Sequence, residues 1–211
     1  GTGRLLEVAA SGGVDGVAVV TARNRREVVA RRERVTKRRQ VHVAVAPLGT
    51  IGAKALVEVG DRVVERAEKL GWPPLVARVK QKRAAVLREL GKGKPARTTL
   101  IAAAAASSAG NDLDHLVSIY IDLGDVETRL TSEFSLGHSW TVLAEGTLSR
   151  LGPRTDTQLR ILRQRAIGAR LAGRLEDART DDEAALAIAR TKGPMAELHV
   201  LADLGLVFGE L

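Results

Sequence analysis

The sequence predicts an all-α fold, a helical-hairpin solenoid of about five hairpins with a period of about 40 residues. Aromatic residues make up only 2% of the 211-residue chain, whereas 45% of its residues are hydrophobic. The core must therefore consist of Ala, Leu, Val and Ile, a composition that suits helices packed closely through small side chains. The other two observations are a recurring glycine and a recurring set of small residues, and a fixed period of this length is typical of solenoids.

The recurring glycine marks the boundaries of the predicted units. Its successive spacings along the chain are 39, 42 and 41, at Gly71, Gly110, Gly152 and Gly193. Glycine often ends a helix in the left-handed conformation, and a proline just beyond it starts the next helix or prevents the first from continuing. Such prolines are present at Pro73, Pro153 and Pro194.

Small residues repeat inside the units with the same period. One series has spacings of 40, 42 and 39 and comprises Ala84, Gly124, Ala166 and Gly205. A second series consists of pairs with a spacing of seven: Ala96 with Ala103, Gly137 with Ala144, and Ala178 with Ala185. A spacing of seven places both members on one helix face, so these residues predict where the two helices of a hairpin approach each other.

Each unit also has a turn near its middle, at residues 49–52, at Gly91 and at Gly173. About 15 to 20 residues of helical periodicity flank each turn. Gly173 is therefore expected to end a first helix, and Leu175 to open the second helix against the core. In the unit that contains Gly124, the second helix is expected to start one residue late.

Two segments are distinguished along the chain. Residues 1–49 are expected to form a divergent N-terminal helical segment that carries a basic run, and residues 50–211 to form the helical repeats. The final AELHVLADLGLVFGEL resembles a first helix without its partner, so we expect the chain to be an excised piece of a longer protein. The uncovered face of this helix, with Leu201, Leu204 and Val207, is expected to expose apolar surface and to permit self-association.

The stretch GRLEDARTDDEAALAIA, residues 173–189, resembles the turn and second helix of a tetratricopeptide (TPR) repeat. The Leu-Gly pairs at 123–124 and 204–205 resemble the corresponding pair of the first helix. The chain departs from the family in its missing aromatics and in a period of 41 instead of 34. EKLGWPPLVARVKQKRAAVLRELGK, residues 68–92, is similar to the repeat regions of large bacterial serine/threonine kinases and related multidomain regulators.

The resemblance implies that the first helices line a concave groove and that the chain is a noncatalytic protein-interaction scaffold or a regulatory region of a larger signalling protein. At 100° per residue, Arg160, Arg163 and Arg170 lie within about 80° of one another. The expected partner-binding groove comprises Arg78, Gln81, Arg88, Arg160, Arg163 and Arg170. Because arginine binds carboxylates through two parallel hydrogen bonds, we expect an acidic protein or peptide partner.

The alternative function is nucleic-acid binding through two basic runs. Residues 23–40 contain nine basic and two acidic residues, and residues 74–98 contain eight and one, so each run carries +7 and the rest of the chain −6. Lysine and arginine that neutralise phosphates would give steep salt dependence. The scarcity of aromatics for base stacking argues against single-strand recognition and leaves duplex binding.

No catalytic or metal site is expected. The chain has no cysteine, and its histidines, which are expected to lie on helix surfaces or flanks, are too far apart in sequence to suggest metal ligands. GHSWT at 137–141 lacks the last glycine and the strand context of a nucleophile elbow, so Ser139 is expected on a helix surface. GKGK at 91–94 and SGGVDG at 11–16 are interpreted as interhelical turns. The acidic trio Asp181, Asp182 and Glu183 is expected to lie on a solvent-exposed outer face.

These features together predict a cytoplasmic protein that is not an enzyme and binds no cofactor and no metal. No stretch approaches the length of about 20 apolar residues that a membrane-spanning helix needs.

Overall fold

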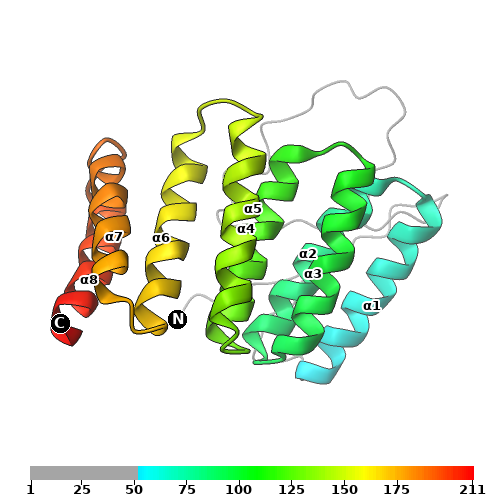
Figure 1. Cartoon of the computed structure of the whole chain (residues 1–211). Coiled ribbons are helices and arrows are strands. Elements are labelled where there is room, and N and C mark those ends of the chain that lie inside the picture. Colours follow the sequence, from blue (N-terminus) through cyan, green and yellow to red (C-terminus); the bar gives the residue numbers. More distant parts are fainter. Residues whose placement is uncertain (1–51) are drawn as a thin grey trace. The chain divides into compact units, whose positions relative to one another are not determined.

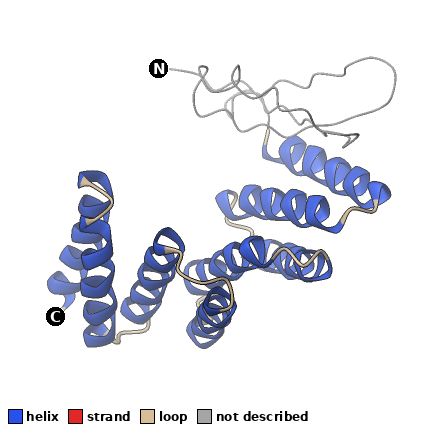
Figure 2. Cartoon of the chain, turned by 90° about the horizontal axis from the view of Figure 1, so that it is seen from above, coloured by secondary structure: helices blue, strands red, loops and turns tan. Residues whose placement is uncertain are grey.

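The computed structural model describes residues 52–211, and every element in that part of the chain is a helix (Figure 2). The eight helices are α1 (Ala53–Leu70), α2 (Pro73–Glu89), α3 (Gly93–Ala109), α4 (Leu113–Arg129), α5 (Phe134–Ser149), α6 (Thr155–Leu171), α7 (Leu175–Arg190) and α8 (Pro194–Glu210). The all-α prediction is confirmed. None of these helices is long and apolar enough to cross a membrane.

The described residues fall into two units, 52–63 and 64–211, which divide within α1. The predicted N-terminal segment 1–49 lies outside the described residues, as do the basic run 23–40 and the turn at 11–16.

Within the 64–211 unit the helices pair as hairpins, α2 with α3, α4 with α5, and α6 with α7, and α8 packs on α7 (Figure 1). The first helices begin at Pro73, Leu113, Thr155 and Pro194, with successive spacings of 40, 42 and 39. The period near 40 is confirmed. Eight helices correspond to roughly four hairpins in residues 52–211, instead of the five predicted for the whole chain.

The turns follow the predicted glycines with one correction. Gly71, Gly91, Gly152, Gly173 and Gly193 all have positive φ. Gly110 instead is right-handed with φ −84°, and Asn111, with φ 51°, takes the left-handed position. Asparagine tolerates this conformation better than most residues. Glycine is still needed at 110, because a Cβ there would lie 2.8 Å from Pro74 Cγ.

The helix starts have local causes. Proline occupies the first turn of α2 and of α8, where its missing N–H leaves no helical hydrogen bond unmade. Asp112 caps α4, and its carboxylate accepts a hydrogen bond from the His115 backbone N–H at 3.3 Å. Between α4 and α5 no glycine is present, and Ser132 adopts φ 58°. Helix α5 starts one position later relative to α4 than α3 and α7 start relative to their own partners, so the predicted late start is confirmed.

Small residues form the seams of the hairpins, as predicted. All five alanines of the seven-spaced pairs are fully buried. In the α4–α5 hairpin, Gly124 and Gly137 lie so close that a Cβ on Gly124 would stand 3.3 Å from the Gly137 carbonyl oxygen, and a Cβ on Gly137 would collide with Thr128 Oγ1. The helices of this hairpin therefore approach nearly backbone to backbone.

The apolar face predicted for the last helix is wrong in two of its three residues. Leu204 and Val207 are buried against α6 and α7, and only Leu201 is exposed. The helix turns Val200, Leu204 and Val207 inward, so its outward face carries Met195, Leu198, Leu201, Leu206 and Phe208. Gly205 lies on this outward side, where an added Cβ would meet nothing within 4 Å. Self-association through this face stays a prediction.

Candidate functional site

The first helices of successive hairpins contact one another: α4 touches α2 and α6, and α6 touches α8. We call the surface formed by α2, α4, α6 and α8 the first-helix face. All six residues of the predicted groove lie on α2 or α6. The structure surrounds them with carboxylates from α4 and α8.

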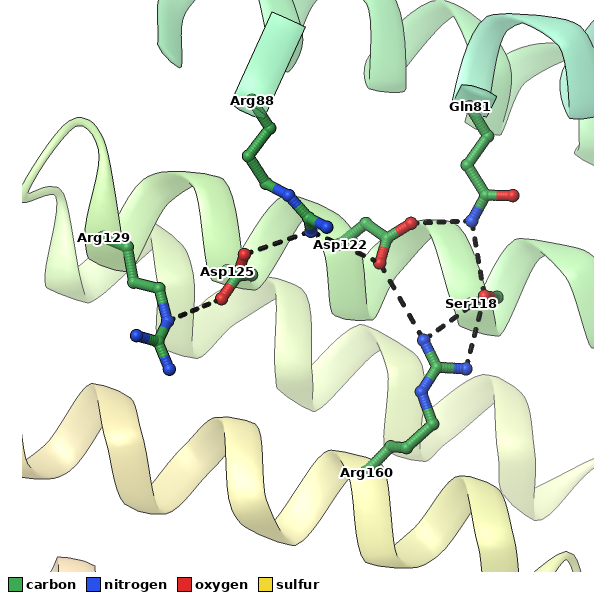
Figure 3. Close-up of polar contacts among 7 residues, drawn as sticks. All are labelled: Gln81, Arg88, Ser118, Asp122, Asp125, Arg129 and Arg160. Carbon is green, nitrogen blue, oxygen red and sulfur yellow. Dashed lines mark hydrogen bonds and ion pairs between the residues drawn. The ribbon is translucent and has the colours of Figure 1, made fainter. Parts of the chain in front are cut away.

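The centre of this face is Asp122 on α4, shown in Figure 3. Gln81 of α2 donates to Asp122 Oδ2 at 2.7 Å and to Ser118 Oγ at 3.3 Å. Arg88 and Arg160 reach Asp122 Oδ1 from opposite sides at 3.9 and 3.8 Å. Burial raises the pKa of Asp122, and the Gln81 hydrogen bond and the two guanidinium groups partly oppose that rise.

Arg88 is engaged mainly elsewhere. Its Nη1 lies 3.1 Å from Asp125 Oδ2, and the other oxygen of Asp125 accepts from Arg129 Nε at 2.8 Å. The Arg88 side chain is about one-third exposed. Its donors therefore serve the packing of α2 on α4.

Arg163 and Arg170 face α8 instead of an open groove. Arg163 Nη2 lies 2.7 Å from Asp203 Oδ2, and Arg170 Nη1 lies 2.5 Å from Glu210 Oε1. These are short, charge-assisted contacts between neighbouring first helices. Both arginines are thus neutralised within the chain.

Arg78 and Arg160 differ from the other arginines of the set. Each is the sixth residue of its helix, α2 or α6, and they flank α4. Their side chains are 63% and 49% exposed. Arg78 meets Asp112 at 3.4 Å, and Arg160 meets Ser118 at 3.4 and 3.5 Å, near the limit of a hydrogen bond.

The sequence reasoning missed the acidic half of this face. The partner carboxylates are Asp112, Asp122, Asp125, Asp203 and Glu210. A signal was available, because Arg163 and Asp203, and likewise Arg170 and Glu210, are 40 residues apart, one period of the repeat.

The prediction that the acidic trio on α7 solvates an outer face is wrong for two of its members. Glu183 is exposed, but Asp181 and Asp182 are buried. Asp181 binds Arg165 through two hydrogen bonds of 2.7 and 3.1 Å, and Arg165 also donates to Glu145 at 2.6 Å. These pairs compensate Asp181, whereas Oδ1 of Asp182 has no hydrogen-bond partner.

Two of the motifs set aside on sequence grounds, GHSWT and GKGK, lie where they were expected. Ser139 is exposed on α5 and donates to the Ser135 carbonyl oxygen at 3.0 Å. Gly91 forms the α2–α3 turn, and α3 begins at Gly93. Across residues 52–211, no three His, Cys, Asp or Glu side chains are grouped so that they could hold a metal ion.

The histidines show one departure. His138 and His199 are exposed, whereas His115 is half-buried and its Nε2 has no hydrogen-bond partner. Burial is the main cause that lowers the pKa of His115, and Asp112 partly opposes it. His42 lies outside the described residues.

About half of the basic run 74–98 is paired. Within residues 52–211, salt bridges join Arg78 with Asp112, Lys80 with Glu68, Arg88 with Asp125, and Arg97 with Glu127. Arg83 donates to Thr99 at 2.6 Å. The run therefore contributes more to internal packing than its sequence charge indicates.

Fold and face together define a helical-repeat protein in which packed hairpins are linked by polar contacts between first helices. The chain is similar to the crystal structure of BtubC (BKLC) from P. vanneervenii, with a TM-score of 0.62 and 18% identity over 72% of this chain and 64% of that one. The match therefore spans less than two thirds of BtubC, and at this identity it shows the helical fold alone. No protein-family model and no curated protein matches the sequence.

Proposed function

We propose that the chain is a noncatalytic protein-interaction module that binds an acidic protein segment on its first-helix face. The observation that carries the proposal is the contrast among the arginines of that face. Arg78 and Arg160 keep exposed guanidinium groups held only by long contacts, whereas Arg163 and Arg170 are tightly paired.

The two exposed arginines lie on either side of α4, so a ligand segment that crosses α4 could reach both. Arginine presents planar, forked donors that match a carboxylate. A ligand carboxylate could replace the 3.4 Å contact of Arg78 with Asp112 or the marginal contacts of Arg160 with Ser118. The loss of these long contacts would cost little free energy. The bound segment should therefore carry two carboxylates, one for each side of α4.

The remaining members of the predicted set have a supporting role in this proposal. A ligand carboxylate at Arg163 or Arg170 would have to displace Asp203 or Glu210 and weaken the attachment of α8. Gln81 and Arg88 similarly hold Asp122 and Asp125. We assign these four residues to the shape of the face and Arg78 and Arg160 to recognition.

The resemblance to tetratricopeptide repeats and to the repeat regions of bacterial kinases is consistent with a scaffold or regulatory role in a signalling protein. Solenoids present extended faces that bind segments of other proteins without active-site chemistry. The similarity to BtubC supports the helical-repeat framework of this proposal.

The test is selection of binding peptides from a random displayed library on the full chain, followed by calorimetry. We expect the selected peptides to be rich in Asp and Glu, and the Arg78→Gln/Arg160→Gln variant to bind them at least about tenfold more weakly, or about 1.4 kcal/mol. The matched control is Arg174→Gln/Arg179→Gln, which removes the same charge at two partly exposed positions off the first-helix face. Equal weakening by both variants, or selected peptides without acidic residues, would contradict the proposal.

The alternative, nucleic-acid binding, is tested on the same variants with a duplex DNA probe over a range of salt concentrations. Binding that falls steeply with salt and is indifferent to Arg78→Gln/Arg160→Gln would transfer the function to the basic runs. Of these, 23–40 lies outside the described residues.

A further inference from the structure

The side chain of Asp182 lies in the middle of α7, where this helix packs against α6 and α8, and it is only 1% exposed. It is the eighth residue of the second helix in its hairpin. The same position holds Leu100 in α3 and Thr141 in α5, which are 2% and 1% exposed. In the described hairpins, this buried position is therefore ionisable only in α7.

The charged groups that face Asp182 do not neutralise it. From α6 they are Arg163 and Arg170, from α8 Asp203, and from α7 itself Asp181. The two arginines are bound to Asp203 and Glu210. Within residues 52–211 no cation forms a salt bridge with Asp182, and its Oδ1 has no hydrogen-bond partner. An ionised Asp182 would be a buried charge next to a second carboxylate, which is costly.

Helix α8 is the element whose displacement would relieve that charge most easily. It contacts α7 and α6 on one side only, through Val200, Leu204 and Val207. Three ion pairs also hold it, namely Arg163 with Asp203, Arg170 with Glu210, and Arg190 with Glu197. Its other side carries the exposed apolar residues of its outward face. Separation of α8 from α7 would give Asp182 access to water and would remove Asp203 from its neighbourhood.

We propose that the protonation state of Asp182 controls the attachment of α8: the neutral carboxyl group holds α8 against α6 and α7, and the ionised carboxylate favours a state in which α8 is detached. Burial and then the Asp203 carboxylate raise the pKa of Asp182 to about 7, against a smaller opposing effect of Arg163. The control therefore operates near neutral pH, where ordinary aspartates do not titrate.

The direction of the pH dependence follows from the raised pKa of Asp182 when α8 is attached, which we call the closed state. Below an ordinary aspartate pKa of about 3.9, Asp182 is protonated in both states and the closed state keeps its full stability. As the pH rises toward 7, the detached state loses its proton first, so the closed state becomes progressively less favoured. Above about 7 the effect is complete, and the opening equilibrium constant should be about thirtyfold larger at pH ~8.5 than at pH ~5.5.

The test measures the distance between the start of α7 and the end of α8, the two helix ends farthest from the α7–α8 turn, in the full chain. The sequence has no cysteine, so Glu176→Cys and Leu206→Cys supply the only two sites for spin labels. Both positions are exposed and lie far from the α7–α8 turn. We expect one short distance at pH ~5.5 and an added longer population at pH ~8.5, with a midpoint near 7.

Three variants decide whether Asp182 is responsible. Asp182→Leu and Asp182→Thr introduce the side chains that α3 and α5 carry at this position, and both should show the short distance alone at either pH. Asp177→Asn removes an exposed carboxylate from the same helix and should leave the pH response intact. Circular dichroism is the check that each variant is folded.

Two results would overturn the proposal: identical distance distributions of the parent chain at both pH values, or a pH response that survives in the folded Asp182 variants. An independent check is a pH titration of the Asp182 carboxyl group, followed by carbon-13 NMR in the full chain without spin labels. An ordinary pKa there would overturn the proposal even if α8 moved with pH.

Discussion

Arg163 on α6 and Asp203 on α8 form a 2.7 Å ion pair between successive first helices. They are the ninth and tenth residues of their helices, and the same two positions are joined at 2.7 Å by Gln81 of α2 and Asp122 of α4. The repeat thus reuses one polar contact between hairpins, with a charged donor in one place and a neutral donor in the other.

The first prediction concerns this contact. Arg163→Ala should lower the free energy of unfolding by about 1–2 kcal/mol, because it removes a charge-assisted hydrogen bond that is only partly exposed. Arg163→Gln, which copies Gln81, should have a smaller effect. Urea unfolding of the single variants, of Asp203→Ala and of the double variant gives the coupling energy, and a coupling of zero would show that the pair contributes nothing.

Gly137→Ala should destabilise the protein by about 1–3 kcal/mol, since the added methyl group would collide with Thr128 Oγ1 and crowd the Gly124 carbonyl oxygen. Gly146→Ala in the same helix is the matched control. A Cβ at 146 meets nothing within 4 Å, so this substitution should stabilise by about 0.5–1 kcal/mol through helix propensity. Similar melting temperatures for the two variants would be inconsistent with the close α4–α5 seam.

Exchange of turn residues should change stability in opposite directions. Ser132→Gly relieves a serine held at φ 58°, and Gly173→Ser places a side chain at φ 74°, where glycine is favoured. We expect a gain of about 0.5 kcal/mol or more for the first and a loss of about 1 kcal/mol for the second. Thermal unfolding would contradict this account if Ser132→Gly were the less stable of the two.

Stability should depend on pH through Asp182. Because burial raises the pKa of this carboxyl to about 7, its contribution declines as pH rises from about 4 to about 7 and is lost above that range. The limiting slope is about 1.4 kcal/mol per pH unit relative to Asp182→Leu. Urea unfolding of both proteins across this range measures the difference, and parallel pH profiles would contradict the assignment.

Much of the fold could be predicted from the sequence because the glycine and small-residue positions have strong backbone requirements. Gly173 needs φ 74°, and Ala178 and Ala185 leave the space that their hairpin partner fills. The late start of α5 was also readable from the sequence. Gly110 was assigned the wrong conformation because the neighbouring Asn111 also tolerates the left-handed one, so the sequence offered two candidates for that position.

The candidate site was less predictable, because helical periodicity assigns a residue to a face but not to a partner. Arg160 and Arg163 share a face of α6, yet the first stays half-exposed beside α4 and the second is bound to Asp203 of α8. Likewise, charge alone placed Asp182 on a solvated surface. Helical periodicity indicated the opposite, because Asp182 lies four residues after Ala178 and three before Ala185, on the helix face that these two buried alanines define.

The outward face of α8 should make the attraction between two molecules in solution depend on their relative orientation. The chain carries a formal net charge of +8, which keeps molecules apart in dilute buffer, while Met195, Leu198, Leu201, Leu206 and Phe208 gather exposed hydrocarbon on one helix. At about 0.1 M salt the repulsion is screened beyond ~10 Å. As salt is added, the osmotic second virial coefficient should therefore fall steeply, and the orientation in which two molecules meet should be governed by this one helix.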